Sequence, residues 1–258
     1  MLGGVYLNSF RPLAAICFVI EYTLIVLITF LAGFTQGLSG FGSILLALPL
    51  LTIFLDIKTV IPLAALHGLL TTVILLIELR KHLDWQKILP LFVGSIPGIP
   101  IGVFFLKNMN TDTIQLTMGL ILVSYALFSL FYQPVIWEMK MAGVSLVGFF
   151  AGCLGGALGA AGPPVIVYTS LQPWTKDKIK ATLQGFYVAS GLIVVLLHAL
   201  NGLTTVPVLW YFLISMPALV LGTYFGSFFY GRISEKTYKR TMFILLALLG
   251  AFLTYGVL

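Results

Sequence analysis

Long apolar runs separated by short polar segments fill almost the whole chain. A helix needs about 20 apolar residues to cross a membrane, and seven runs approach or exceed that length. They are residues 13–34, 59–79, 88–106, 113–132, 179–200, 206–230 and 241–258. Three shorter runs cover residues 43–55, 141–154 and 163–171. The pattern predicts an all-α integral membrane protein with about ten helical elements and no soluble domain.

The second half of the chain repeats the first in a weak but ordered way. The matched positions are Ala32-Gly33 and Ala151-Gly152, Gly40 and Gly159, Ala64 and Ala181, Leu66 and Leu183, His67 and Gln184, Gly68 and Gly185, Ser95 and Ser215, Pro97 and Pro217, Gly102 and Gly222, and Thr117-Met118 and Thr241-Met242. Because a repeat determines the architecture, residues 1–135 and 136–258 are predicted to form two five-element repeats. Two apolar chains can also be aligned this well by chance, so the loop charges have to decide.

The loop charges indicate that the second repeat is inverted. One side of the predicted membrane collects eleven basic residues: Arg80, Lys81, Lys87, Lys140, Lys176, Lys178, Lys180, Arg232, Lys236, Lys239 and Arg240. The other side collects three: Arg11, Lys58 and Lys107. Basic loops favour the cytoplasm, which places both termini outside it. Equivalent loops are basic in one half and poor in basic residues in the other, as inverted repeats of secondary transporters require.

Composition supports a membrane protein in contact with the lipid bilayer. Hydrophobic residues make up 60% of the chain and charged residues 9%, whereas a soluble domain has about 25% charged residues. The mean hydropathy is +1.09. The net charge of +6 belongs to cytoplasmic loops near lipid head groups, and no nucleic-acid partner is predicted. Cys17 and Cys153 lie within apolar runs and are expected to be small core residues.

Two glycine-rich segments adjoin the short runs, at residues 36–43 and 155–164. The short runs cannot comfortably span a bilayer alone, so each is predicted to form a re-entrant hairpin with its neighbour. Irregular backbone at membrane depth is tolerated only where it is buried in protein or lines a wet cavity. We therefore expect the two segments to enter from opposite faces and to meet near the midplane.

The segments have the chemistry of an anion site. A helix begins after each one, and helix N-termini offer free N–H groups and a partial positive charge. The candidate substrate-binding residues here are Gln36, Ser39, Gly40, Gly42, Ser43, Gly159, Gly162 and Pro163. The alternative is that the glycines are small-residue contacts between helices. Lys180, at the start of the run 179–200, is counted with its basic loop. No other Lys or Arg lies within a predicted span, so neutral donors and helix ends would hold an anion.

His67 and Gln184 are further candidate binding residues, because they occupy matched positions near the middle of their elements. Intramembrane polar residues usually face the bundle interior or a cavity, although a hydrogen bond between helices would explain both residues as well. His67 is also a candidate for coupling to a proton. Glu21 is the second coupling candidate, with an interfacial position as its alternative.

The segments 32–42 and 151–164, with Pro97 and Pro217 inside the fourth element of each repeat, resemble the TauE/SafE sulfite exporter family, also called the toluene sulfonate uptake permeases. The resemblance extends from about Tyr22 to the end of the chain. It implies movement of sulfur-containing anions, such as sulfite, thiosulfate, sulfoacetate or other organosulfonates, across a bacterial inner membrane. Many members have a denser run of glycines at residues 41–43, so the resemblance carries over the site but not a particular substrate.

The prediction is therefore a secondary transporter of a small sulfur-containing anion that works by alternating access. The alternatives are a carrier of a different small organic anion and a non-transporting membrane protein. No enzyme is expected, because the chain has no metal-ligand set, no phosphate loop and no nucleophile elbow. No cofactor and no metal are predicted, and a homodimer is compatible with a bundle of this size.

Overall fold

The computed structural model describes residues 11–131, 139–230, 232 and 235–255. These residues form ten α-helices and one short 3-10 helix, without a strand. The first half contains α2 (Arg11–Ser39), α3 (Ser43–Leu51), α4 (Ile57–Leu79), η1 (Arg80–His82), α5 (Trp85–Asn108) and α6 (Thr111–Phe131). The second half contains α7 (Met141–Leu158), α8 (Gly162–Ser170), α9 (Lys176–Leu200), α10 (Val206–Phe229) and α11 (Glu235–Tyr255).

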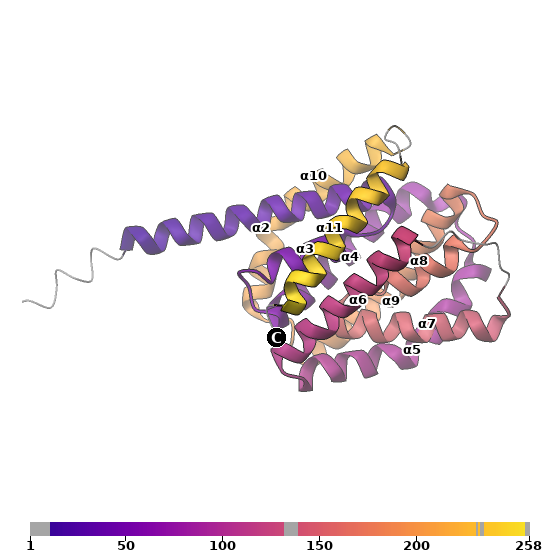
Figure 1. The fold of residues 1–258 in the computed structure, drawn as a ribbon, viewed down its shortest axis with the longest axis horizontal. Coiled ribbons are helices and arrows are strands. Elements are labelled where there is room, and N and C mark those ends of the chain that lie inside the picture. The colour runs from indigo at the N-terminus through magenta and orange to yellow at the C-terminus, as the bar shows by residue number, and fades with distance from the viewer. Residues whose placement is uncertain (1–10, 132–138, 231, 233–234, 256–258) are drawn as a thin grey trace, which may run out of the picture.

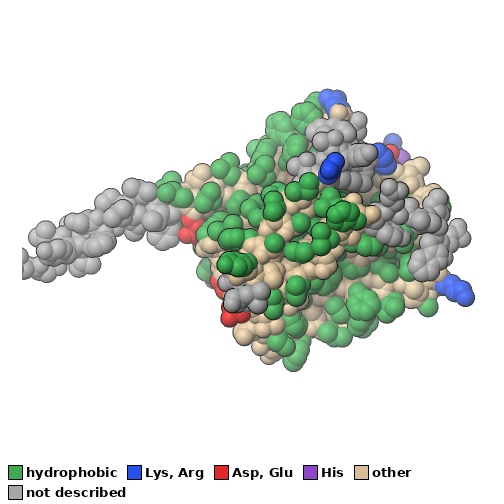
Figure 2. All heavy atoms as spheres, in the orientation of Figure 1, with side chains coloured by type: hydrophobic (Ala, Val, Ile, Leu, Met, Phe, Trp, Pro, Cys, Tyr) green, Lys and Arg blue, Asp and Glu red, His purple; other side chains and the backbone are tan. Residues whose placement is uncertain are grey.

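The helices have the length and surface of a multi-pass membrane protein. Within the described part of the chain, seven helices are long and apolar enough to cross a bilayer, and α11 adds a shorter apolar stretch at Met242–Tyr255. Large apolar side chains cover much of the visible outer surface (Figure 2). Exposed examples on the described helices are Phe104, Leu196 and Phe228. Because lipid replaces water around the bundle, such exposure is the stable arrangement. The all-α membrane class predicted from the apolar runs is confirmed.

Helices from the two halves pack in pairs (Figure 1). The most extensive contacts join α2 to α10 and α5 to α7, followed by α6 to α11 and α4 to α9. In chain order, α2 of the first half corresponds to α7 of the second, and α5 corresponds to α10. Exchanging the halves therefore turns the α2–α10 pair into the α7–α5 pair. The same exchange leaves the third and fourth pairs unchanged.

Glycines allow the two most extensive pairs to approach closely. A Cβ atom on Gly37 of α2 would lie 2.2 Å from the carbonyl oxygen of Thr223, and one on Gly156 of α7 would lie 2.2 Å from that of Ile99. Gly33 and Gly152 are equally confined against the facing backbone. Small residues four positions apart commonly form such interfaces in membranes. Small-residue packing, the alternative considered from the sequence, thus describes these glycines.

Short helices α3 and α8 lie inside the bundle. Each has nine residues, which at 1.5 Å per residue gives about 14 Å, half the thickness of a bilayer core. The non-helical breaks before them are residues 40–42, here the first tip, and 159–161, the second tip. Both are shorter than the predicted segments because the last turns of α2 and α7 remain helical through their glycines. As a result α7 has 18 residues and counts as a candidate span.

The loops predicted to share one side of the membrane contact one another. Lys178 forms an ion pair with Asp84 at 3.2 Å, and the Tyr230 hydroxyl donates to Asp177 at 2.9 Å. The ion pair lowers the pKa of Asp84 through its hydrogen bond with Lys178. The loop residues Lys107 and Asn201 meet at 3.3 Å. Figure 2 shows the visible Lys and Arg side chains mainly towards one end of the bundle and most Asp and Glu side chains towards the other.

Candidate functional site

Each tip begins with a glycine that ends a helix in the left-handed conformation. Gly40 has φ of +83° and Gly159 has φ of +67°. The Gly40 N–H donates to the Gln36 carbonyl at 2.7 Å, and the Gly159 N–H donates to the Gly155 carbonyl at 2.9 Å. This is a common way to end a helix, and glycine suits it because a side chain would be strained there. The two glycines are therefore conformational residues, and they occupy matched positions in the two halves.

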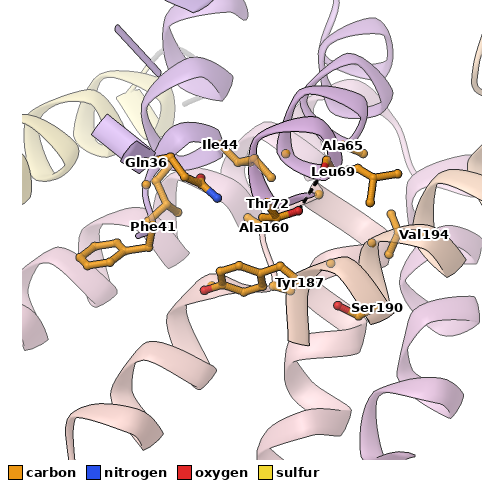
Figure 3. A pocket seen from close by; sticks show the side chains of 18 of the residues that line it. Gln36, Phe41, Ile44, Ala65, Leu69, Thr72, Ala160, Tyr187, Ser190 and Val194 are labelled. Carbon is orange, nitrogen blue, oxygen red and sulfur yellow. Dashed lines mark hydrogen bonds between the residues drawn. The ribbon is translucent and has the colours of Figure 1, made fainter. Parts of the chain in front are cut away.

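Side chains of α2 and α3 hold the first tip together. The Gln36 side-chain oxygen accepts from the Ser43 N–H at 3.2 Å and also from the Ser43 hydroxyl. The Ser39 hydroxyl lies 2.6 Å from the Phe41 carbonyl oxygen and 2.8 Å from that of Thr35. Because the carbonyl end of the Gln36 amide is occupied, its NH₂ group faces the other way, into the space beside the tip (Figure 3).

Helix α9 holds the ends of both broken helices. The Lys180 ammonium donates to the Gly37 carbonyl at 2.7 Å, and the Gln184 amide donates to the Gly40 carbonyl at 2.7 Å. Near the other end of α9, His198 Nε2 lies 2.9 Å from the Gly156 carbonyl oxygen, to which it donates. These bonds satisfy carbonyls that the last turn of a helix leaves unpaired. Lys180 and His198 are about 27 Å apart along α9, so one helix spans both breaks.

Lys180 is a functional residue that the sequence analysis placed in a loop. Its side chain is 3% exposed and its ammonium lies 3.9 Å from the Tyr230 ring centroid. It lies on α9 because that helix begins at Lys176, before the apolar run. The spacing of Lys180 and Gln184, one helical turn apart, was the available signal.

Fewer side chains hold the second tip. Among the described contacts, the one side-chain hydrogen bond to this region comes from His198. Pro163 and Pro164 occupy the first turn of α8, where proline fits because its missing N–H would have no helical partner. A Cβ atom on Gly162 would lie 3.3 Å from the Tyr187 hydroxyl oxygen. That oxygen is buried and has no hydrogen-bond partner within the described structure.

The two tips enclose a cavity of about 70 Å³ together with α4 and α9 (Figure 3). Gly68, the central residue of α4, and Tyr187, one residue from the centre of α9, both line it. The cavity therefore lies at mid-depth of the bundle. Its lining residues are Gln36, Phe41, Gly42, Ile44, Leu45, Ala65, Gly68, Leu69, Thr72, Gly155, Gly159, Ala160, Ala161, Gly162, Ile166, Tyr187, Ser190, Gly191 and Val194.

Some of the candidate binding residues line the cavity, and the others lie around it. Gln36, Gly42, Gly159 and Gly162 line the cavity. The others stand around it, and they are Ser39, Gly40, Ser43, Pro163, His67 and Gln184. Of these, Ser39, Ser43 and Gln184 make the bonds that fix the first tip. Tyr187 was missed because a tyrosine within an apolar run is indistinguishable from an ordinary core residue.

His67 links α4 to α10. Its Nε2 lies 2.8 Å from the Ser215 hydroxyl oxygen, and that hydroxyl donates to the Tyr211 carbonyl at 2.6 Å. Because Ser215 uses its proton there, His67 Nε2 carries the hydrogen and Nδ1 is an acceptor. Nδ1 is buried without a partner in the described structure. Glu21, the other coupling candidate, accepts from the Tyr211 hydroxyl at 2.7 Å.

The cavity wall is neutral. Among the described residues, neither a basic nor an acidic side chain lines it, and no group of three or more His, Cys, Asp or Glu residues is placed to hold a metal ion. The lining residues with polar side chains are Gln36, Thr72, Tyr187 and Ser190, and backbone of the tips joins them. The Thr72 and Ser190 hydroxyls donate to the Leu69 and Phe186 carbonyls of their own helices. Such a site can hold a small solute through N–H and O–H donors.

A bundle of membrane-spanning helices with a small, mainly apolar cavity at mid-depth, bordered by broken helices, is typical of multi-pass membrane transporters. The family described as "Sulfite exporter TauE/SafE" matches residues 25–253. The chain therefore belongs to the TauE/SafE sulfite exporter family, as the resemblance of its glycine-rich segments indicated, and its activity is transport.

One relative is the "Probable sulfite/organosulfonate exporter TauE" of Cupriavidus necator. It is 26% identical over 175 residues, which cover 66% of this chain and 68% of the relative. No solved structure matches the chain.

Proposed function

We propose that the protein is a secondary transporter that moves a small sulfur-containing anion, such as sulfite, thiosulfate, sulfoacetate or another organosulfonate, across the bacterial inner membrane. The observation that carries this proposal is the mid-depth cavity between the two tips, lined by first-turn residues of α3 (Ile44 and Leu45) and of α8 (Gly162). N-termini of helices attract anions. The name of the Cupriavidus necator relative supports the substrate class.

The size of the cavity favours a small substrate. A water molecule needs roughly 10–15 Å³ of such space, so a cavity of about 70 Å³ suits a solute of a few heavy atoms. Sulfite or a sulfonate head group meets this limit, whereas a bulky substituent would require the tips to separate.

Alternating access by two inverted repeats is the proposed mechanism. Its support is the exchange pattern of the helix pairs, together with left-handed glycines at matched positions in the two tips. Rocking of one repeat against the other would open the cavity to each side in turn. Helix α9 is central to this motion because it binds carbonyl groups beside both tips.

A proton is the proposed coupling ion, with His67 and Glu21 as its carriers. His67 has a buried, unpartnered Nδ1 next to cavity residue Gly68, and Glu21 is hydrogen-bonded to Tyr211 of the same helix that contacts His67. If this is right, His67→Ala removes the response of uptake to an imposed pH gradient but retains exchange of labelled for unlabelled substrate. A gradient response equal to that of the native protein would exclude His67.

Flux into proteoliposomes tests the transport proposal. Uptake of labelled sulfite, labelled methanesulfonate and a labelled carboxylate is compared, with protein-free liposomes as the control. We expect flux of the sulfur anions above the control and above the carboxylate. Flux selective for the carboxylate would indicate a carrier of a different organic anion, and no flux under any gradient would indicate a non-transporting membrane protein.

A further inference from the structure

We propose that the cavity binds its substrate as a monoanion and that Tyr187 and Gln36 are the side chains that recognise its oxygen atoms. The inference rests on the proposed function and specifies the charge state of the cargo. It follows from three features of the cavity: no cation among its described lining residues, the starts of α3 and α8 beside it, and two polar lining residues from opposite halves. Gln36 turns its NH₂ group towards the cavity, and Tyr187 has a buried, unpartnered hydroxyl beside Gly162.

The positive potential available in the cavity matches a single negative charge. In the described structure, Lys180 is the buried cation beside the tips, and its ammonium is occupied by the Gly37 carbonyl and the Tyr230 ring. It does not line the cavity. Each helix N-terminus contributes about half a positive charge, so α3 and α8 together supply about one.

A dianion would be poorly compensated in this place. The cost of moving an ion from water into a medium of low dielectric rises with the square of its charge, so a dianion costs about four times as much as a monoanion of equal size. The apolar wall formed by Leu45, Leu69, Ile166 and Val194 supplies no compensating charge. The cavity therefore selects against sulfate, thiosulfate and the dianionic form of sulfite, and against sulfoacetate, whose carboxylate adds a second charge. Among the proposed substrates it favours hydrogensulfite and monoanionic sulfonates.

Tyr187 provides a donor from the second half. Its hydroxyl is buried and unpartnered in the described structure, and it lies beside Gly162, the first residue of α8. A buried hydroxyl without a partner is unfavourable in the empty protein. A substrate oxygen placed near the start of α8 would accept from it and remove that penalty.

Gln36 provides a donor from the first half. It is 4% exposed, and its oxygen is fixed by the backbone and hydroxyl of Ser43. This bond orients the NH₂ group into the cavity (Figure 3). A monoanionic oxyanion placed between the tips would thus meet one side-chain donor from each half, while a small apolar substituent could rest on the apolar wall.

Sulfite makes the proposal measurable, because it changes from monoanion to dianion near neutral pH. The apparent dissociation constant of a ligand rises in inverse proportion to its competent fraction. For sulfite it should rise about tenfold for each pH unit above this ionisation. Methanesulfonate is a monoanion throughout and sulfate a dianion, so they serve as charge-fixed probes.

The experiment is isothermal titration calorimetry of the purified full-length protein with sulfite, methanesulfonate and sulfate at several pH values. The described titratable side chains on the helices around the cavity are Glu21, Tyr22, Lys58, His67, Glu78, Cys153, Tyr168, Lys176, Asp177, Lys178, Lys180, Tyr187 and His198. Methanesulfonate controls for all of them, because its own charge is constant. We expect pH-independent binding of methanesulfonate, weakening of sulfite binding with rising pH, and no binding of sulfate.

Tyr187→Phe tests the assigned donor, and we expect at least a tenfold loss of methanesulfonate affinity. Tyr168→Phe is the matched control, since Tyr168 is 6% exposed on α8 and packs against Trp174 outside the cavity. Sulfate binding equal to that of methanesulfonate, or sulfite binding that strengthens with pH, would overturn the charge assignment. Unchanged affinity in Tyr187→Phe would overturn the donor assignment. Failure of all three probes to bind would instead overturn the proposed function, and this inference with it.

Discussion

The first and second tips occupy matched places in the two halves, but they are held in different ways. The first is fixed by Gln36 of α2 and Ser43 of α3 and by Lys180 and Gln184 from α9. The second has prolines after it and one side-chain hydrogen bond nearby, from His198. Since fewer bonds must break for the second tip to move, we expect the first to be the fixed wall of the cavity and the second the adaptable one.

Replacing the glycine at the start of each tip should produce the largest difference. Gly40→Ala places a side chain at φ of +83° and within 2.6 Å of Lys180 Cγ, whereas Gly159→Ala has φ of +67° and its nearest neighbour at 3.5 Å. Left-handed backbone costs roughly 1–2 kcal/mol for a non-glycine residue. The loss of stability should exceed this range in Gly40→Ala and fall within it in Gly159→Ala. Thermal unfolding in detergent measures both losses.

Gly202→Ala is the control for that pair, because Gly202 has φ of +74° and open space around its Cα. It should cost the same backbone strain and leave uptake unchanged. Equal losses of stability and uptake for Gly40→Ala and Gly159→Ala would show that the two tips are equivalent.

The next largest effect is expected at Lys180, whose ammonium lies beside the first tip and has no counterpart beside the second among the described residues. Lys180→Met keeps most of the side-chain volume but removes the charged bond to the Gly37 carbonyl. Hydrogen bonds of charged groups contribute about 1.5–3 kcal/mol. The free energy of unfolding should fall by about this amount, and the unfolding temperature should fall with it. Lys81→Met, at an exposed position, should leave the unfolding temperature unchanged. A Lys180 variant as stable as the Lys81 variant would show that the bond to the Gly37 carbonyl does not stabilise the first tip.

A smaller effect is expected from matched neutral bonds. Gln184→Leu frees the Gly40 carbonyl and His198→Leu frees the Gly156 carbonyl, each at a cost of about 1 kcal/mol. Their costs in stability should be similar, but Gln184→Leu should also weaken substrate binding because it loosens the fixed wall. Calorimetric affinities for methanesulfonate separate the two; a greater loss of affinity in His198→Leu would reverse the assignment of fixed and adaptable tips.

The smallest effect is expected at Pro163. Pro163→Ala keeps the helix start but enlarges the conformational freedom of the unfolded chain, which costs about 0.4–1 kcal/mol. Substrate affinity should stay within twofold of the native value. A loss of affinity comparable to that of Tyr187→Phe would mean that the second tip is as rigid as the first.

The apolar pattern was sufficient to predict the ten helices, because the need to satisfy backbone hydrogen bonds in lipid links apolar length to helix position. Boundaries differed where polar residues extend helices beyond the apolar run. Lys176, Asp177 and Lys178 form the first turn of α9, and Glu235 begins α11. In the same way Gly155 and Gly156 continue α7, since a neighbouring helix fills the space that their missing side chains leave.

The site was only partly predictable. Glycines at matched positions indicated both tips, because left-handed backbone favours glycine. The separate roles of the nearby polar residues could not be predicted from the sequence. Gln184 binds the Gly40 carbonyl and Ser43 binds the Gln36 side-chain oxygen, while the NH₂ group of Gln36 turns to the cavity. Lys180 and Tyr187 depend on which face of α9 meets the tips, and that is set by contacts between distant parts of the chain.

The most direct test of the account is to locate a bound oxyanion in the protein. Hydrogenselenite is a monoanion with the shape of hydrogensulfite, and its selenium scatters anomalously. In crystals of the protein soaked with it at mildly acidic pH, the account predicts an anomalous peak between the two tips, within hydrogen-bond reach of the Gln36 amide and the Tyr187 hydroxyl. A peak that lies elsewhere in the bundle, with the space between the tips empty, would contradict it.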